Sequence, residues 1–405
     1  MSKVFDGVKV VEAAEWWYVP SAGGILADWG ADVIHIEHPE HGDKLRGLRV
    51  GKTSERGLNG GRSYMFEHAN RGKRGIGLDL SIAEGRDLLM ELVARADIFT
   101  TSFLPEARQR FGMDVDDIRR VNPNIIYARG SGYGSKGPEA GKPGFDSSAS
   151  WARAGMAHVL RTSTDAKPLV PRAAFGDSIA AMTLAGGIAA ALFKRATTGE
   201  PSVVDVSLLG SAMWVMTPDI VASKIYDVPE LPLDSRYPGN PIYNSYQTAD
   251  GRWIQLSMPQ SDVYWPDVVT RIGHPELIDD SRFLTAELRD QNRDVCTQTL
   301  KDIFGSAPLD HWREKLASAK GVWAYMQSPR ELHDDVQVVA NHYIEYLDLD
   351  GSEMPIVTAP VQFDGAQHHV TRAPLHGEHT DEVLQEELGL SMERLIELKI
   401  AGAIN

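Results

Sequence analysis

Asp177 is the residue whose setting best suits covalent chemistry. It stands in the run Ala173-Ala174-Phe175-Gly176-Asp177-Ser178, and a long stretch of small and apolar residues, Ile179 to Lys194, follows it. This pattern predicts a helix that begins near Asp177. A carboxylate at such a place can cap the helix by accepting backbone N–H hydrogen bonds, or it can stay exposed as an anionic nucleophile. The cap is the commoner role of aspartate at a helix start, and the local sequence leaves both interpretations open.

A glycine-rich segment offers a second candidate. Gly132-Tyr133-Gly134-Ser135-Lys136-Gly137 matches the G-x-G-x-x-G pattern of dinucleotide-binding proteins and follows a predicted strand. However, Pro138, Gly141, Pro143 and Gly144 occupy the place where that fingerprint requires a helix N-terminus to hold a pyrophosphate. We therefore interpret residues 130–144 as a loop and not as a nicotinamide site.

Histidines and cysteine give little support for a metal centre. The pairs His368-His369 and His376-x-x-His379 lie in a segment rich in proline and glycine, and no carboxylate recurs at ligand spacing. Solvated loop histidines are the favoured interpretation, and no metal is expected. Cys296 is the only cysteine, so an intrachain disulfide is excluded.

Composition narrows the class of protein. The chain has 405 residues, 42% hydrophobic and 24% charged, with a formal net charge of −15. This charge disfavours nucleic acid and anionic membranes as partners, so an anionic ligand would need a local cluster of basic residues. We see no N-terminal targeting pattern and no uninterrupted apolar run of membrane-spanning length. The expectation is a soluble, cytoplasmic protein.

The elements that must position Asp177 alternate between strands and helices. Predicted strands cover residues 8–11, 31–37, 97–100 and 124–128, and predicted helices cover 21–29 and 82–96. Strands that alternate with helices of this length are typical of βαβ units. The predicted fold is therefore α/β with a parallel sheet.

A change in amino-acid composition marks the start of a second domain. Four prolines, Pro229, Pro232, Pro238 and Pro241, predict an extended connection between domains. A hairpin should follow over residues 243–258, turning at Asp250-Gly251, and then helices over 262–319. Strands are expected within 343–363, and helices at 380–387 and 392–401. We place a large domain at residues 1–225 and 330–405, and a small domain at 226–329.

Short motifs spread over the chain resemble the class III CoA-transferase family, which includes formyl-CoA transferase, carnitine CoA-transferase and α-methylacyl-CoA racemase. The matching residues, in order, are Leu26 to Ile34, Glu37-x-Pro39, Gly42-Asp43, Asn70 to Arg74, Leu78-Asp79-Leu80, Ser131 to Gly134, Gly137-Pro138, Gly176-Asp177, Thr198-Gly199, Val204 to Ser207, and Ala373-Pro374-x-x-Gly377-Glu378-His379-Thr380. Each match is weak alone, but together they run from Leu26 to Thr380.

The resemblance implies a fold and a mechanism. The large domain would be Rossmann-like and would bind coenzyme A, the small α+β domain would be inserted, and two chains would form an interlocked homodimer. The carboxylate that matches Asp177 would attack an acyl-CoA, giving an aspartyl anhydride and then an aspartyl-CoA thioester. CoA would finally pass to a carboxylic acid acceptor. The resemblance implies no prosthetic group, because coenzyme A and acyl-CoA are substrates.

Family positions also suggest the residues around Asp177. Arg46, Lys73, Arg74 and Arg110 are the candidates to meet the phosphates of coenzyme A, with Phe103 beside its pantetheine or adenine. Asp146 matches a position near the active site, where it would be an auxiliary carboxylate or an ordinary loop cap.

Two departures from the family pattern bear on activity. Racemases place a histidine where this chain has Phe145, which has no proton to exchange, and His158 does not match that position. Trp17 replaces a glutamine that polarises the acyl oxygen in some transferases, so its indole would donate a hydrogen bond or line an apolar acyl pocket. CoA transfer is thus favoured. A racemase or epimerase and a non-catalytic acyl-CoA-binding protein remain the alternatives.

Overall fold

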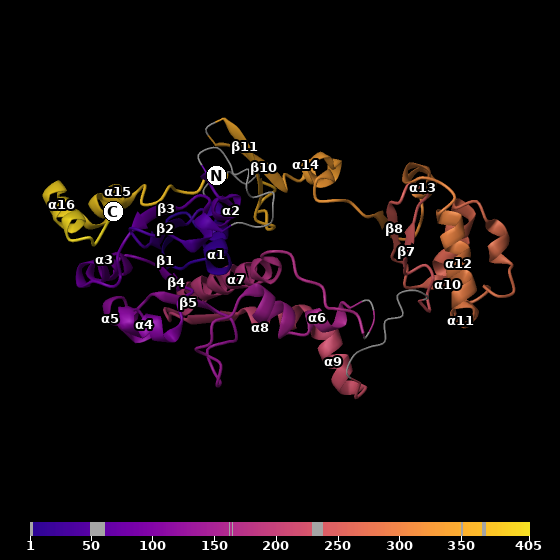
Figure 1. The fold of residues 1–405 in the computed structure, drawn as a ribbon, viewed down its shortest axis with the longest axis horizontal. Coiled ribbons are helices and arrows are strands. Elements are labelled where there is room, and N and C mark those ends of the chain that lie inside the picture. Colours follow the sequence, from indigo (N-terminus) through magenta and orange to yellow (C-terminus); the bar gives the residue numbers. More distant parts are fainter. Residues whose placement is uncertain are drawn as a thin grey trace. The chain divides into compact units, whose positions relative to one another are not determined.

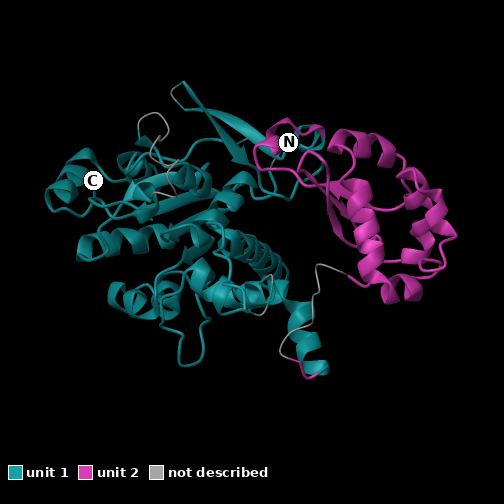
Figure 2. Cartoon of the chain, turned by 45° about the vertical axis from the view of Figure 1, so that its right-hand side comes forward, with its two compact units in different colours: residues 1–226, 337–405 teal, residues 227–336 magenta. Residues whose placement is uncertain are grey.

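The computed structural model describes residues 3–48, 61–161, 163, 165–228, 238–349, 351–366 and 370–405. The chain forms two compact units, residues 1–226 with 337–405 and residues 227–336 (Figure 2). The first boundary follows residue 226, one residue later than the sequence predicted. The second follows residue 336, seven residues later than predicted. Most of the proline-rich connection, residues 229–237, falls outside the described residues.

A six-stranded sheet forms the centre of the larger unit. Its strands are β1 (Lys9–Ala13), β2 (Asp32–Glu37), β3 (Arg74–Gly77), β4 (Ile98–Thr101), β5 (Ile126–Ser131) and β6 (Val203–Ser207). All neighbours pair in parallel, in the order β3-β2-β1-β4-β5-β6, with Val10 opposite Val33 on one side and Ile98 on the other. The order reverses between β1 and β4. This arrangement confirms the predicted α/β fold with a parallel sheet.

Helices cover both faces of this sheet (Figure 1). The helices of the larger unit are α1 (Tyr18–Asp28), α2 (Tyr64–Asn70), α3 (Ala83–Val93), α4 (Pro105–Phe111), α5 (Val115–Val121), α6 (Met156–Val159), α7 (Phe175–Thr198), α8 (Leu208–Val215), α9 (Thr217–Ile225), α14 (Val336–Ala340), α15 (Thr380–Leu388) and α16 (Met392–Ile400). Short turns of 3-10 helix, η1 (Lys44–Gly47), and of π-helix, η4 (Asp146–Ala152), lie between them. An antiparallel pair, β10 (Ile344–Leu349) and β11 (Ser352–Val357), completes the unit.

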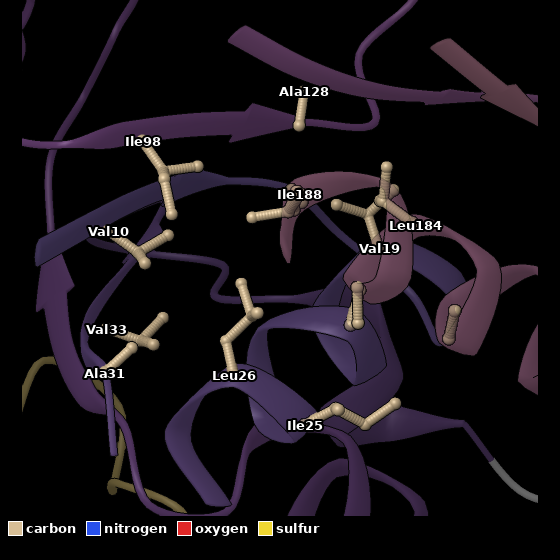
Figure 3. Close-up of a cluster of buried hydrophobic side chains, with 14 of the residues drawn as sticks. Val10, Val19, Ile25, Leu26, Ala31, Val33, Ile98, Ala128, Leu184 and Ile188 are labelled. Carbon is tan, nitrogen blue, oxygen red and sulfur yellow. The ribbon is translucent and has the colours of Figure 1, made fainter. Parts of the chain in front are cut away.

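Two apolar cores lie on opposite faces of the sheet. On one face, Leu26 of α1 and Leu184 and Ile188 of α7 pack with Val10 and Ile98 of the strands (Figure 3). On the other face, residues of α3 and α5 pack with Val383, Leu384, Leu395 and Leu398 from the last two helices. Strands β1 to β5 are therefore largely buried, as expected for a parallel sheet covered on both faces, whereas the edge strand β6 is partly exposed.

Helix α7 is the longest helix among the described residues. By length and composition it is apolar enough to cross a membrane, and it is the one such helix in the described part of the chain. Ala180, Ala181, Leu184, Ala185 and Ile188 form the face that packs into the core of the larger unit. Its small residues fit close packing against α1, so the apolar sequence has a place inside this fold.

The smaller unit is α+β. Its antiparallel sheet has the order β7 (Ser245–Gln247), β8 (Trp253–Leu256) and β9 (Trp323–Tyr325), and its helices are α10 (Ser261–Arg271), α11 (Ala286–Gln291), α12 (Arg293–Phe304) and α13 (Leu309–Leu316), with short turns η5 (Pro275–Ile278) and η6 (Glu331–Asp334). The predicted hairpin is confirmed: β7 pairs with β8, and Gly251 takes a positive φ of 76° in the turn between them. Trp265, Phe283, Phe304 and Trp312 lie in the core of the unit.

Candidate active site at the start of helix α7

Asp177 lies inside the first turn of α7 and does not cap it. The helix begins at Phe175, and its cap position is Ala174, which takes a left-handed φ of 62° and makes no side-chain cap hydrogen bond. The sequence placed the helix start two residues too late, so the interpretation of Asp177 as the cap is wrong. Because its carboxylate accepts no hydrogen bond from the described residues, it is available for chemistry.

Asp146 accepts a hydrogen bond from a backbone N–H group at the start of α7. Its Oδ1 accepts a hydrogen bond from the backbone N–H of Gly176 at 2.9 Å, and the side chain is buried at 8% exposure. A Cβ atom on Gly176 would stand 2.4 Å from Ser150 Oγ and 2.6 Å from Asp146 Oδ1. Glycine is therefore required here for η4 to approach the helix start. Asp146 therefore holds the start of α7, and its expected role as an auxiliary carboxylate stays a prediction.

Asp177 faces a cavity of about 380 Å³, which we call the Asp177 cavity. Its walls come from the residues that follow three strands: Glu15, Trp16 and Tyr18 after β1, Ser102, Phe103 and Leu104 after β4, and Ser131 and Gly132 at the end of β5. The strand order reverses between β1 and β4, and ligands of doubly wound sheets bind at the carboxyl ends of strands beside such a reversal. The fold thus places the carboxylate where a ligand crevice is expected.

The electrostatics of the Asp177 cavity favour the neutral acid. Burial, followed by the negative charge of Asp146, raises the pKa of Asp177 from its usual value near 4 to about 7. At neutral pH the group therefore exists as comparable amounts of acid and carboxylate. A carboxylate with this basicity is a better nucleophile than a solvated one, and titratable groups with such shifts gather at functional sites.

Backbone strain lies beside the site. Trp16 takes a φ of 72°, a conformation that costs a bulky residue energy and persists only when its surroundings hold it. Its N–H donates to Asp43 Oδ1 at 3.1 Å, and its ring meets Phe145 edge to face at 5.3 Å between centroids. Trp16 and Phe145 both line the Asp177 cavity. The residue that replaces the racemase histidine is therefore an aromatic wall of that cavity.

Trp17 points to the other side of this loop. Its Nε1–H donates to Ser178 Oγ at 3.2 Å, and its ring stacks on His68 with 5.2 Å between centroids. Trp17 lines a second cavity of about 600 Å³, which we call the Trp17 cavity. Because the indole N–H already has a protein acceptor, the geometry supports the apolar-pocket alternative for this residue more than the oxyanion one.

Of the predicted coenzyme A residues, Phe103 lines a third cavity of about 150 Å³, and Arg46 and Arg110 contact residues that line it. Phe103 lines this cavity and also the Asp177 cavity, so it stands between the two. Arg46 donates two hydrogen bonds to Glu37 at 2.6 and 2.7 Å, and Arg110 lies 4.6 Å over the ring of Phe111. Glu37 and Phe111 both line the third cavity. A role in coenzyme A binding therefore stays a prediction for Arg46, Phe103 and Arg110.

Lys73 and Arg74 are placed differently. The ammonium of Lys73 is fully buried and donates to Glu12 at 2.5 Å, to Pro20 O at 2.7 Å and to Asn70 Oδ1 at 2.9 Å. All three of its donors are used inside the protein, so we assign Lys73 to the interior and not to a phosphate site. Arg74 pairs with Asp32, Glu386 and Glu387 and lines none of the three cavities.

The structure also adds residues that the sequence analysis missed. Tyr18 lines the Asp177 cavity, and its buried hydroxyl has no hydrogen-bond partner in the described part of the chain. Burial, and then the charges of Asp177 and Asp205, raise the pKa of this phenol. Lys44 lines the same cavity and pairs with Glu15 at 2.6 Å. Each of the two is adjacent in sequence to a residue that the sequence analysis had named: Tyr18 follows Trp17, and Lys44 follows Asp43. This adjacency is the signal that could have identified them.

Histidines singled out from the sequence contact protein groups in the structure. Within the described ranges no three His, Cys, Asp or Glu residues group as metal ligands, and His368-His369 lies outside those ranges. His376 Nε2 contacts the carbonyl of His38 at 2.9 Å. His158, on α6, contacts Arg161 and does not line the Asp177 cavity.

Comparison with known proteins identifies the class that this fold and site define. The chain belongs to CoA-transferase family III, whose sequence model matches residues 5–380. The resemblance seen in the sequence is thereby confirmed.

Individual relatives cover almost the whole chain. It is 33% identical over 400 residues to the (R)-2-hydroxy-4-methylpentanoate CoA-transferase of Clostridioides difficile, with 98% of each chain covered. It is 33% identical over 403 residues to the cinnamoyl-CoA:phenyllactate CoA-transferase of Clostridium sporogenes, covering 98% of this chain and 96% of that enzyme. Among solved structures, a CAIB/BAIF family protein from Brucella suis superposes with a TM-score of 0.82 and 27% identity, covering 96% of this chain and 100% of that one.

Proposed function

We propose that this protein moves CoA from an acyl-CoA donor to a carboxylic acid acceptor, with Asp177 as the covalent nucleophile. The observation that carries the proposal is the Asp177 carboxyl group, which faces a cavity at the strand reversal with a pKa raised to about 7 and no hydrogen bond from the described residues. Membership of CoA-transferase family III and relatives named as CoA-transferases support the reaction class.

The proposed reaction divides one exchange into four attacks. An Asp177 oxygen attacks the thioester carbon of the donor, the C–S bond breaks, and the thiolate of CoA leaves behind a mixed anhydride. The thiolate then attacks the aspartyl carbon, releases the donor acid and forms an aspartyl-CoA thioester. The acceptor carboxylate attacks that carbon and expels the thiolate again. Attack by the thiolate on the acceptor acyl carbon frees Asp177. Anhydride and thioester are similarly activated, so each step is feasible.

Tyr18 is the proposed donor to the oxyanions of these steps. Tyr18 lines the Asp177 cavity, its buried hydroxyl has no hydrogen-bond partner among the described residues, and its raised pKa keeps the proton on the oxygen. Gly130 makes room for the ring, because a Cβ there would stand 2.7 Å from Tyr18 Cε1. A preorganised donor of this kind stabilises developing negative charge. Trp17 and Asp146 then act by shaping the site, Trp17 beside the acyl group and Asp146 at the helix start.

Coenzyme A would extend from Asp177 past Phe103 to the third cavity. Arg46 and Arg110 would meet its phosphates there, and Lys44 lies on the way. We further propose an interlocked homodimer in the cytoplasm. Exposed apolar residues on α8 and α9, Trp214 at 81% and Ile225 at 68%, support an interface on that side.

A trapping experiment tests the mechanism. The protein is incubated with a panel of acyl-CoA thioesters, treated with hydroxylamine or borohydride, and digested for mass spectrometry. We expect modification of the peptide that carries Asp177, and none in Asp177→Ala. CoA transfer with an unmodified Asp177 peptide would overturn the mechanism. Solvent deuterium at the substrate α-carbon would point to the racemase alternative. Wild-type binding without turnover, retained in Asp177→Ala, would point to an acyl-CoA-binding protein.

A further inference from the structure

The Trp17 cavity differs in chemistry from the Asp177 cavity. It measures about 600 Å³ and is bounded by α1, α2, α7 and the chain from Met354 to Pro360. Most of the described side chains that line it are apolar, among them Trp17, Ile25, Ala181, Met182, Val357 and Ala359. Cavities of this size that are apolar and hold a few polar groups are typical of binding sites for small organic molecules.

Helix α7 contributes residues to the walls of both cavities. Asp177 lines the Asp177 cavity, whereas Ser178, Ala181 and Met182 line the Trp17 cavity. Residues four apart on a helix lie one above the other with about 5–6 Å between their Cβ atoms. Ala181 therefore lies one turn beyond Asp177 on the same face, and its methyl group leaves space there. A molecule joined to Asp177 can extend along this face past the Trp17–Ser178 hydrogen bond.

The Trp17 cavity offers no free positive charge among its described lining residues. Arg71 is the one formally charged side chain among them, and it is 3% exposed and bound to Asp28 at 2.6 Å. Burial, and then the charge of Arg71, lowers the pKa of His68 to about 3, so its imidazole is neutral near pH 7. A second carboxylate placed here would lose its hydration without gaining a counter-ion, which is costly.

One buried hydroxyl group belongs to a residue that lines the Trp17 cavity. Ser21 of α1 lines the Trp17 cavity, is 6% exposed, and its hydroxyl finds no hydrogen-bond partner within the described ranges. An unpartnered buried hydroxyl is unfavourable unless a ligand satisfies it. The cavity therefore suits an apolar chain with at most one neutral polar substituent.

We infer that the Trp17 cavity holds the side chain of the transferred acid, and that this acid is a monocarboxylate with a branched aliphatic or aromatic side chain. The inference rests on the proposed CoA transfer at Asp177. It deepens that proposal by excluding dicarboxylic acids as the preferred substrates, because the described wall has apolar surface for a carbon chain and no cation for a second carboxylate.

Binding of two thioesters tests the inference without turnover. Calorimetry compares 4-methylpentanoyl-CoA with succinyl-CoA on the Asp177→Asn variant, so that the CoA part of the ligand is the same. We expect at least tenfold tighter binding of the branched thioester. Adding Met182→Trp, which fills the cavity, should reduce that ratio to below threefold. Adding Thr183→Trp, the next residue on α7 but exposed and outside the cavity lining, should preserve it.

The outcomes separate the two proposals. Equal or tighter binding of succinyl-CoA, or a ratio that Met182→Trp leaves unchanged, would overturn the inference. If Asp177 becomes labelled while succinyl-CoA is preferred, the proposed transfer stands and the cavity assignment fails. If the branched thioester is preferred but Asp177 is never labelled, the cavity assignment stands and the proposed mechanism fails.

Discussion

Asp146 Oδ1 accepts the backbone N–H of Gly176 at 2.9 Å, so one carboxylate holds the helix turn that carries another. The two acids differ in partners: Asp146 is fixed by a hydrogen bond, whereas Asp177 accepts none from the described residues. The charge of Asp146 nevertheless acts on Asp177, because it is the second cause of the raised pKa after burial. The arrangement links the architecture of the helix start to the basicity of Asp177.

The pH dependence of acylation should report this link. Attack requires ionised Asp177, so the single-turnover acylation rate should rise with pH and reach half its maximum near the pKa of about 7. Asp146→Asn keeps an acceptor for Gly176 and removes the negative charge, which lowers the pKa of Asp177. The midpoint should therefore move to lower pH, by roughly half a unit to one unit. A midpoint that stays in place or moves up would show that Asp146 does not act through charge.

Removal of the Asp177 charge should stabilise the protein above neutral pH. The folded-state pKa of about 7 lies above the unfolded value near 4, so folding favours the protonated group, and this contribution is lost as the pH rises through 7. We expect Asp177→Asn to unfold with a free energy higher by on the order of 1–2 kcal/mol at pH 8. The gain should disappear below about pH 4. Denaturant titrations at both pH values measure it, and an equal gain at pH 4 would contradict the charge explanation.

Two glycines of α7 should respond in opposite ways to alanine. Gly176→Ala brings a Cβ within 2.4 Å of Ser150 Oγ and should displace η4 from the helix start, lowering stability and the acylation rate together. Gly186 has nothing within 4 Å of such a Cβ. Gly186→Ala should therefore stabilise the protein by about 0.5–1 kcal/mol, because alanine favours helix. Thermal unfolding and single-turnover acylation check the pair. An unchanged acylation rate in Gly176→Ala would remove the link between helix start and chemistry.

Two lysines should differ in what they do for stability. Lys73→Met leaves Glu12 buried without its counter-ion, which should cost about 3–5 kcal/mol of unfolding free energy. Lys44→Met breaks an ion pair whose lysine side chain is 63% exposed, and such pairs contribute at most about 1 kcal/mol. Denaturant unfolding of both variants measures the difference. A small loss in Lys73→Met with a large loss of CoA affinity would instead restore Lys73 to the coenzyme site.

Tyr18→Phe isolates the proposed oxyanion donor. The ring remains to fill its place beside Gly130, and only the unpartnered hydroxyl is lost. We expect kcat to fall by about 10²-fold, the range found for oxyanion donors, with KM little changed. Stability should stay equal or rise, because a buried polar group without a partner is removed. A variant with normal kcat would exclude Tyr18 from the chemistry.

The sequence predicted the sheet more reliably than the surroundings of Asp177. Strand and helix periods depend on local pattern, so β1, β2 and α3 were found within a few residues of their bounds. The role of Lys73 was missed because it depends on Glu12, 61 positions earlier in the chain, and no local pattern shows that pairing. The helix start was displaced because its acceptor is Asp146, 30 positions away, whereas a sequence pattern expects the cap beside the helix.

The larger unit is built from two separate segments of the chain, residues 1–226 and 337–405, and this has a consequence for its folding during synthesis. The sheet and Asp177 leave the ribosome well before the segment from Met354 to Pro360 that closes the Trp17 cavity, and before the helices that cover Ile76 and Leu78. Until those last segments arrive, an apolar sheet face lacks its cover and the nascent chain offers a ready surface for a chaperone. The wall of the Trp17 cavity can therefore be completed only after the segment from Met354 to Pro360 has been synthesised.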